Sequence, residues 1–144
     1  MERLIEDAIG RLFSDDAFLL ETDVAERAIA ARLAFYLAPQ FPQHQVDVEY
    51  NRHGIEPKMV DLPEHCRGGG QRYIYPDIVI HQRGHDEDNL LVIQIKKETN
   101  REPRDCDRAV IEAMKREFRY AHGLQIDLPA GPGASKRKPH LNWL

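Results

Sequence analysis

Two nearly continuous apolar runs stand close together in the middle of the chain, within residues 75–97. The first covers residues 78–80 and the second covers residues 90–95, and both are rich in Ile and Val. β-Branched residues favour strands, and an apolar run without polar alternation is typical of a central strand covered on both faces. The short polar turn GHDEDN between the runs predicts an antiparallel pair of buried strands.

Helical spacing of apolar residues predicts two helices before these strands. Residues 2–13 form an amphipathic pattern, and residues 24–38 are rich in the strong helix formers Ala and Leu. Pro39 ends the second helix, because proline disfavours a helical residue before it. Asp23 and Glu26 have the spacing of a capping box, so they mark its start.

The flanking segments complete an α/β pattern. Residues 46–50 alternate as a first strand, and residues 124–128 alternate as a last strand. Residues 105–122 carry an apolar stripe at helical spacing, and Gly123 follows as the C-cap. We therefore expect an α/β domain with a small mixed central sheet flanked by helices.

Two segments lack a clear period. Residues 51–72 contain glycines and prolines and read as a long loop that is either functional or mobile. Residues 129–144 form a basic tail rich in Pro and Gly, which we expect to be loose. The single domain then covers residues 1–128, with residues 1–20 as an N-terminal helical extension.

Composition narrows the class of protein. The 144 residues suit one domain with a real core, and no segment reads as a signal peptide or a membrane span. We therefore expect a cytoplasmic protein. Cys66 and Cys106 have no metal-like spacing, and without a secretion signal they are most simply reduced thiols. His65 beside Cys66 reads as part of a solvated loop.

The two central strands also carry the candidate chemistry. Because side chains alternate along a strand, Asp77 shares a face with Val79, and Gln94 and Lys96 share a face with Val92. Antiparallel pairing brings these polar groups together at the end of the strands. Asp is a hard oxygen ligand for Mg²⁺, and Lys supplies a positive charge that can stabilise a phosphorane or position a hydrolytic water.

The order Pro-Asp, strand, turn, strand, Gln-x-Lys resembles the core of the PD-(D/E)XK nuclease superfamily, over roughly residues 20–128. The resemblance implies a restriction-endonuclease-like αβββαβ core and a metal-dependent nuclease. In such a site Asp77, Gln94 and Glu26 hold Mg²⁺ or Mn²⁺, and Lys96 completes the catalytic set. Glu26 is the helix position that matches the family, although it equally well only closes the capping box.

Gln94 departs from the family pattern, in which this position is an acid. Gln keeps a carbonyl oxygen but loses the negative charge, so metal affinity should fall. Three explanations stay open: the site borrows a carboxylate from elsewhere, the fold survives as a non-cleaving binder, or the Gln is a deliberate inactivating change. Glu98, two residues beyond Lys96, is one candidate for a borrowed acid, although a solvated strand end explains it more simply.

Charge distribution suggests a partner. Basic residues gather after the second strand, where a phosphate backbone would need them: Lys97, Arg101, Arg104 and Arg108. A solvated helix face explains the helical ones equally well. We therefore expect a Mg²⁺-dependent nuclease or an inactive relative acting on nucleic acid, DNA rather than RNA, with a homodimer compatible with the family. The alternative is a non-catalytic module of the same fold that binds nucleic acid or protein.

Overall fold

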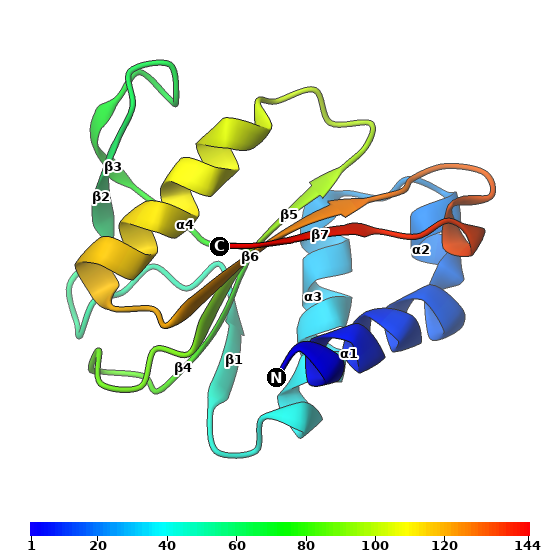
Figure 1. Cartoon of the computed structure of the whole chain (residues 1–144), viewed down its shortest axis with the longest axis horizontal. Coiled ribbons are helices and arrows are strands. Elements are labelled where there is room, and N and C mark those ends of the chain that lie inside the picture. Colours follow the sequence, from blue (N-terminus) through cyan, green and yellow to red (C-terminus); the bar gives the residue numbers. More distant parts are fainter.

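A five-stranded mixed sheet forms the centre of the molecule in the computed structural model, which describes all 144 residues (Figure 1). Its strands lie in the order β1 (Gln45–Val48), β4 (Ile78–His81), β5 (Leu91–Lys97), β6 (His122–Leu128) and β7 (His140–Trp143). The β5–β6 pair is parallel and the other neighbours are antiparallel. The expected antiparallel pairing of the two apolar strands is confirmed, since β4 and β5 are adjacent.

Helices cover both faces of this sheet, as the apolar strands require. On one face lie α1 (Glu2–Asp15), α2 (Ala17–Glu21) and α3 (Glu26–Leu37), and on the other lies α4 (Arg104–Phe118) (Figure 1). Two short 3-10 helices, η1 (Ala38–Gln40) and η2 (Ala134–Lys136), complete the helical elements. The expected mixed α/β fold with flanking helices is confirmed. None of the helices has the length and apolar character needed to cross a membrane.

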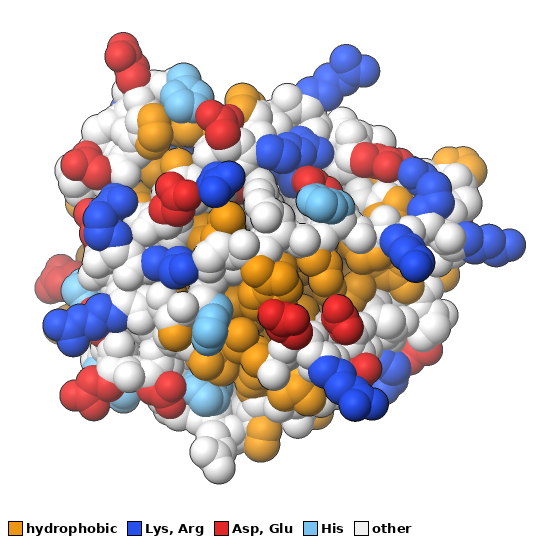
Figure 2. Space-filling view, viewed as in Figure 1, with side chains coloured by type: hydrophobic (Ala, Val, Ile, Leu, Met, Phe, Trp, Pro, Cys, Tyr) orange, Lys and Arg blue, Asp and Glu red, His pale blue; other side chains and the backbone are white.

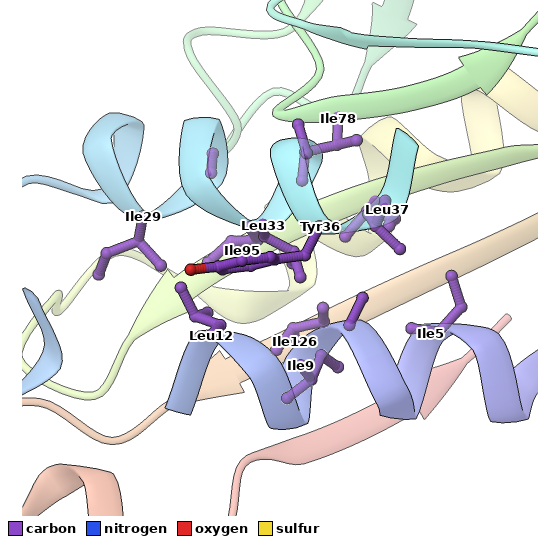
Figure 3. Packing of buried hydrophobic residues seen from close by; sticks show 14 of the residues in the cluster. Ile5, Ile9, Leu12, Ile29, Leu33, Tyr36, Leu37, Ile78, Ile95 and Ile126 are labelled. Carbon is purple, nitrogen blue, oxygen red and sulfur yellow. The ribbon is translucent and has the colours of Figure 1, made fainter. Parts of the chain in front are cut away.

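Alternation along β4 and β5 divides the core in two. Ile78 and Ile93 pack with α1 and α3, whereas Val79 and Val92 pack against α4. In the larger cluster the apolar face of α1 meets α3 and the sheet, and Figure 3 shows Ile9 beside Ile126 of β6. The two faces of the central strands are therefore fixed, and polar residues on the Val79 face must point toward α4.

A second, two-stranded sheet lies largely within residues 51–72, which were expected to form a long loop. It consists of β2 (Met59–Leu62) and β3 (Gly70–Tyr73), which pair antiparallel. Val60 and Leu62 alternate with exposed neighbours and are buried against α4. The loop expectation was wrong because a four-residue alternation is short, and the adjacent glycines outweighed it in the sequence.

A disulfide joins this small sheet to α4. Cys66, in the connection between β2 and β3, is bonded to Cys106 in the first turn of α4, and their Cα atoms are 5.4 Å apart. The expectation of reduced thiols was therefore wrong: the fold brings together two cysteines that are 40 residues apart in sequence. Disulfides persist in oxidising compartments and are transient in a reducing cytoplasm, so the cytoplasmic location stays an expectation.

The C-terminal segment is ordered, in contrast to the expected loose tail. Leu141 pairs with Ile126, and Trp143 pairs with Leu124, so β7 extends the sheet beyond β6. Arg137 also anchors the segment through an ion pair with Glu98, at 2.7 Å between nitrogen and oxygen. The Pro and Gly content predicted a loop, but the short alternation before the end of the chain forms an edge strand.

Two helix ends differ from the sequence interpretation. The capping box at α3 does not form: the N-cap is Ala25, and Asp23 takes a positive φ of 52° and pairs with Lys97 instead. Gly123 is not the C-cap of α4, since Arg119 holds that position in the left-handed conformation. Gly123 lies in β6, where an added Cβ would lie 2.2 Å from a methyl carbon of Ile111, so its lack of a side chain lets α4 approach the sheet.

Replacing Lys58 by Met should stabilise the protein by about 1–3 kcal/mol at pH 7. Lys58 is 2% exposed, and its Nζ lies over the Tyr50 ring and donates only to the Tyr50 carbonyl. Burial lowers the pKa of Lys58 to about 8, so the folded state binds fewer protons than the unfolded state between about pH 8 and 10.5. Wild-type stability should rise over that interval, and the gain from Met should shrink.

The measurement is urea unfolding of the wild type and Lys58→Met at pH 7 and at pH 10. The exposed Lys138 provides a matched control, because Lys138→Met should leave the midpoint unchanged at both pH values. A lower midpoint for Lys58→Met at pH 7 would mean that the ring contacts of the ammonium outweigh its burial.

Candidate functional site

Polar side chains from four elements converge at the C-terminal end of β5, between the two helical layers. Asp77 directly precedes β4, Gln94 and Lys96 lie on β5, Glu26 begins α3 and Asp107 lies in the first turn of α4. Charges on Asp107, Glu26 and Lys96 all shift the pKa of the Asp77 carboxyl, and Lys96 Nζ lies 3.3 Å from Asp107 Oδ2. The structure therefore brings together all four sequence-predicted catalytic residues and adds a fifth, Asp107.

Strand register sets the position of Asp77. Ile78 pairs with Ile93, so Asp77 lies opposite Gln94. The backbone N–H of Asp77 donates to Gln94 Oε1 at 2.8 Å, and Asp77 Oδ2 accepts from the N–H of Ile95 at 2.7 Å. Because Asp77 and Gln94 lie on the Val79 face, both are on the side of the sheet that faces α4, as the alternation predicts.

Asp107 is the residue that sequence reasoning missed. It is 9% exposed and belongs to the buried stripe of α4 with Val110 and Met114. Its Oδ2 lies 3.3 Å from Lys96 Nζ but makes no hydrogen bond. A buried carboxylate on an otherwise apolar stripe is costly, so its ion pair with Lys96 makes Asp107 a candidate member of the site.

Burial and mutual repulsion raise the pKa values of both acids. Burial raises the pKa of Asp77 to about 7, and the negative charges of Asp107 and Glu26 add to this, against the Ile95 hydrogen bond and Lys96. Burial also raises the pKa of Asp107, although Lys96 opposes the shift. Like charges held together in a buried position are typical of a site that binds a cation.

Lys96 remains a cation despite its burial. It is 6% exposed and lies between Asp107 and Glu102, whose Oε2 accepts from Nζ at 3.1 Å. Burial alone would lower its pKa, but the two carboxylates outweigh burial and raise the pKa above the ordinary value. Lys96 therefore acts in this site as a fixed positive charge and not as a proton acceptor.

Glu26 has a structural position at the edge of the site. Its Oε2 accepts from the N–H of Lys97 at 2.7 Å, and its Oε1 accepts from the Asn100 amide at 2.8 Å. Both carboxylate oxygens hold the end of β5, so Glu26 contributes negative potential and positioning. Glu98 does not supply a borrowed acid, because both of its carboxylate oxygens pair with Arg137.

The donor set fits a hard dication with few protein ligands. Asp77 and Asp107 offer carboxylate oxygens, whereas Gln94 Oε1 is engaged by the Asp77 backbone. The only group of three or more His, Cys, Asp or Glu ligand atoms within mutual reach lies elsewhere, at His65, Cys66 and Cys106. The carboxylates of Asp77 and Asp107 therefore do not form a complete set of metal ligands. Such a partial set suits Mg²⁺, which needs one or two carboxylates and keeps several waters.

The predicted substrate-binding residues are mostly engaged within the protein. Ion pairs join Lys97 to Asp23 at 2.9 Å, Arg104 to Asp127 at 3.1 Å and Arg108 to Glu112 at 3.0 Å. Arg101 is exposed and forms no ion pair. On the face that Figure 2 shows, basic side chains are interspersed with acidic ones. Of the four predicted residues, only Arg101 is therefore without an ion-pair partner inside the protein.

A cavity of about 240 Å³ adjoins the site. Glu102 and Asp107 line it together with Arg67 and the two cysteines of the disulfide. Its walls come from the start of α4, from the loop before α4 and from the connection between β2 and β3. The insertion that the sequence presented as a loop thus forms one wall of the approach to Asp107.

Replacing Asp77 by Asn should stabilise the metal-free protein by about 2–4 kcal/mol at pH 8. The folded pKa of about 7 lies above the unfolded value, so the folded state binds more protons between about pH 4 and pH 7. Stability of the wild type should therefore fall as pH rises through that interval, and the gain from Asn should be nearly absent at pH 4.5. Urea unfolding in EDTA at the two pH values measures both quantities.

Added Mg²⁺ should reverse the order of the two proteins, because a dication stabilises the ionised carboxylate of the wild type only. A destabilised Asp77→Asn protein at pH 8 without metal would show instead that the Asp77 carboxylate is favourably paired in its ionised form.

Comparison of the chain with protein families found no matching family, and comparisons with curated proteins and with solved structures found no match either.

Proposed function

We propose that this protein is a Mg²⁺-dependent nuclease that hydrolyses phosphodiester bonds. Position 94 is Gln instead of the acid of the nuclease pattern, and Asp107 supplies the missing carboxylate. The convergence of Asp77, Asp107 and Lys96 at the end of β5 carries the proposal. Two carboxylates and a fixed cation in a buried polar site are what metal-assisted hydrolysis of a phosphodiester requires. Gln94 then acts as a neutral spacer that holds Asp77 and lies beside Asp107.

The order of elements supports the same reading. Without the inserted β2–β3 sheet, the chain runs α3, β1, β4, β5, α4 and β6, which is the αβββαβ order of the nuclease superfamily that the sequence resembles. The candidate residues also lie where that resemblance implies, at the start of β4 and on β5. The restriction-endonuclease-like core is part of the proposal.

In this mechanism Asp77 and Asp107 would hold a Mg²⁺ ion, and the chemistry it would supply is polarisation of the phosphate and a lowered pKa of a bound water. Lys96 stabilises the negative charge that develops on the phosphoryl oxygens, because its own charge is fixed by Asp107 and Glu102. Glu26 holds the end of β5, so the Lys96 side chain stays directed toward α4. Arg67 lines the adjoining cavity, and Arg101 directly precedes Glu102, which also lines it; both are exposed, and we assign them to backbone phosphates.

A second candidate is a nucleic-acid-binding module of the same fold that does not cleave. The absence of an acid at Gln94 favours the non-cleaving module, because the loss of a carboxylate weakens the binding of a dication. The two candidate functions differ in whether the Asp107 carboxylate compensates for the carboxylate that is absent at Gln94. They share a nucleic-acid partner, with DNA as the first substrate to test.

The test is nicking of a supercoiled plasmid with Mg²⁺ or Mn²⁺, together with calorimetric Mn²⁺ titration. We expect metal-dependent cutting by the wild type, none in EDTA, and none by Lys96→Met. Gln94→Glu should tighten Mn²⁺ binding and raise cleavage modestly, because it adds a carboxylate to a site that Asp107 already serves.

Cleavage by Gln94→Glu alone would identify Gln94 as an inactivating residue. If neither protein cuts plasmid, single-stranded DNA or RNA, the nuclease proposal is wrong, and retained binding would then favour the module.

A further inference from the structure

His65, Cys66 and Cys106 form a cluster of soft ligand atoms outside the nuclease-like site. One ligand atom from each lies within 4.8 Å of the other two. The residues come from two separate segments, since His65 and Cys66 lie between β2 and β3 and Cys106 lies in α4. Cys66 is buried and His65 is exposed, so the cluster reaches from the interior to solvent.

These ligand types match a zinc site. Cys thiolates and His imidazole are the preferred ligands of Zn²⁺, which is tetrahedral with bonds of about 2.0–2.3 Å and ligand atoms roughly 3.3–3.8 Å apart. The two sulfur atoms are bonded to each other in the disulfide, so they must move apart once it is reduced, and the His65 ligand atom already lies within 4.8 Å of both. The Mg²⁺-type chemistry of the Asp77 site is different, because hard oxygen ligands suit Mg²⁺ and thiolates suit zinc.

Asp105 supplies the outer support that zinc-binding histidines use. Its Oδ2 lies 2.5 Å from His65 Nε2. A histidine that donates one ring N–H to a carboxylate presents its other nitrogen to a metal in a fixed orientation. With Nε2 held by Asp105, Nδ1 of His65 is free to bind. The 240 Å³ cavity touches all three ligand residues and provides room for a water in the fourth position.

We propose that reduction of the Cys66–Cys106 disulfide converts this cluster into a site for one Zn²⁺, held by both thiolates and the His65 imidazole. A dithiol reductant supplies two electrons and two protons, which break the S–S bond and leave two thiols, while the reductant becomes a disulfide. Zn²⁺ then displaces both thiol protons as it binds. The disulfide and the metal are therefore alternative links between the same two segments.

Co²⁺ is the probe for the experiment, since it reports tetrahedral thiolate ligation by absorption and Zn²⁺ displaces it. The protein is reduced with a dithiol, freed of reductant without oxygen and titrated with Co²⁺. We expect one equivalent to bind with a thiolate-to-cobalt charge-transfer band and tetrahedral d–d bands, and Zn²⁺ to abolish them. The oxidised protein should show neither band.

Two histidine variants separate the site from adventitious thiol binding. His65→Ala should weaken Co²⁺ binding by about 10–100-fold. His53→Ala is the matched control: His53 is also exposed and also pairs with an acid, Asp86, at 2.5 Å, but it lies away from the cysteines. Cys106→Ser should remove the charge-transfer intensity of one thiolate and most of the affinity.

Absence of a thiolate band in the reduced wild type would overturn the proposal, as would equal affinities of His65→Ala and His53→Ala. Both readouts are spectroscopic, so they do not depend on nuclease activity and remain valid if the protein cuts nothing.

Discussion

Cleavage by Asp107→Asn should fall by about 100-fold or more at saturating Mg²⁺. Asp107 is the only buried carboxylate of α4, and it contacts Lys96 at 3.3 Å with an oxygen that has no hydrogen-bond donor. Asn keeps the shape but removes the charge that the metal requires. The loss should exceed the effect of any change at Gln94, because Gln94 already lacks that charge.

The pKa of Asp77 gives a second readout of the same change. Negative charge on Asp107 raises the pKa of Asp77, so Asp107→Asn should lower it below about 7 in the metal-free protein. NMR titration of the Asp77 carboxyl measures this shift independently of any substrate.

Glu117→Gln provides the control, since Glu117 is an exposed acid on the same helix and forms no ion pair. It should cut as the wild type does. Full activity of Asp107→Asn, with an unchanged pKa of Asp77, would remove Asp107 from the proposed mechanism. Far-UV circular dichroism of both variants checks that the helical content is retained.

Removing the disulfide should lower the free energy of unfolding by about 4 kcal/mol. The bond closes a loop across a sequence separation of 40 residues, and a crosslink of that length strongly restricts the unfolded chain. The closed segment contains β3, β4 and β5, so the crosslink constrains the strands that carry the candidate site. Urea unfolding of the oxidised protein and of Cys66→Ala/Cys106→Ala measures the difference.

The same titration with a reductant present distinguishes the crosslink from the packing of the sulfur atoms. Reduction of the wild type should reproduce most of the loss, and the double variant should not respond to reductant. If the urea midpoint of the wild type is the same with and without reductant, the two cysteines are not joined by a disulfide in solution.

Much of the fold followed from period and composition. The β4–β5 pair, the helices α1, α3 and α4 and the common face of Asp77, Gln94 and Lys96 were predicted, because apolar runs and regular spacing leave little choice of structure. The strands β2, β3 and β7 were missed although they are as long as β1 and β4, because glycines and prolines around them dominate the local signal. β2 packs against α4 and β7 pairs with β6, whereas the residues of β3 are exposed and are held by pairing with β2.

Only those parts of the candidate site that depend on the local sequence pattern were predicted. Asp107 could have been found, because it stands three and seven residues before Val110 and Met114 on a stripe that is otherwise apolar. The disulfide could not, since spacing along the chain does not indicate which distant segments the fold joins. The ion pairs of Lys97 and Arg104 could likewise not be predicted, because their partners Asp23 and Asp127 are remote in sequence.

The packing in Figure 3 has a consequence for how the chain folds as it is synthesised. Ile5 and Ile9 on the first helix belong to the same core cluster as Ile126 and Leu128, which leave the ribosome more than a hundred residues later. Apart from its contact with α3, the apolar face of α1 therefore stays exposed to solvent until β6 has been synthesised and can pack in this cluster. Long-range closure of this kind is slow and exposes hydrophobic surface to other chains. Yield of native protein should depend on chaperones that shield the nascent N-terminal helices.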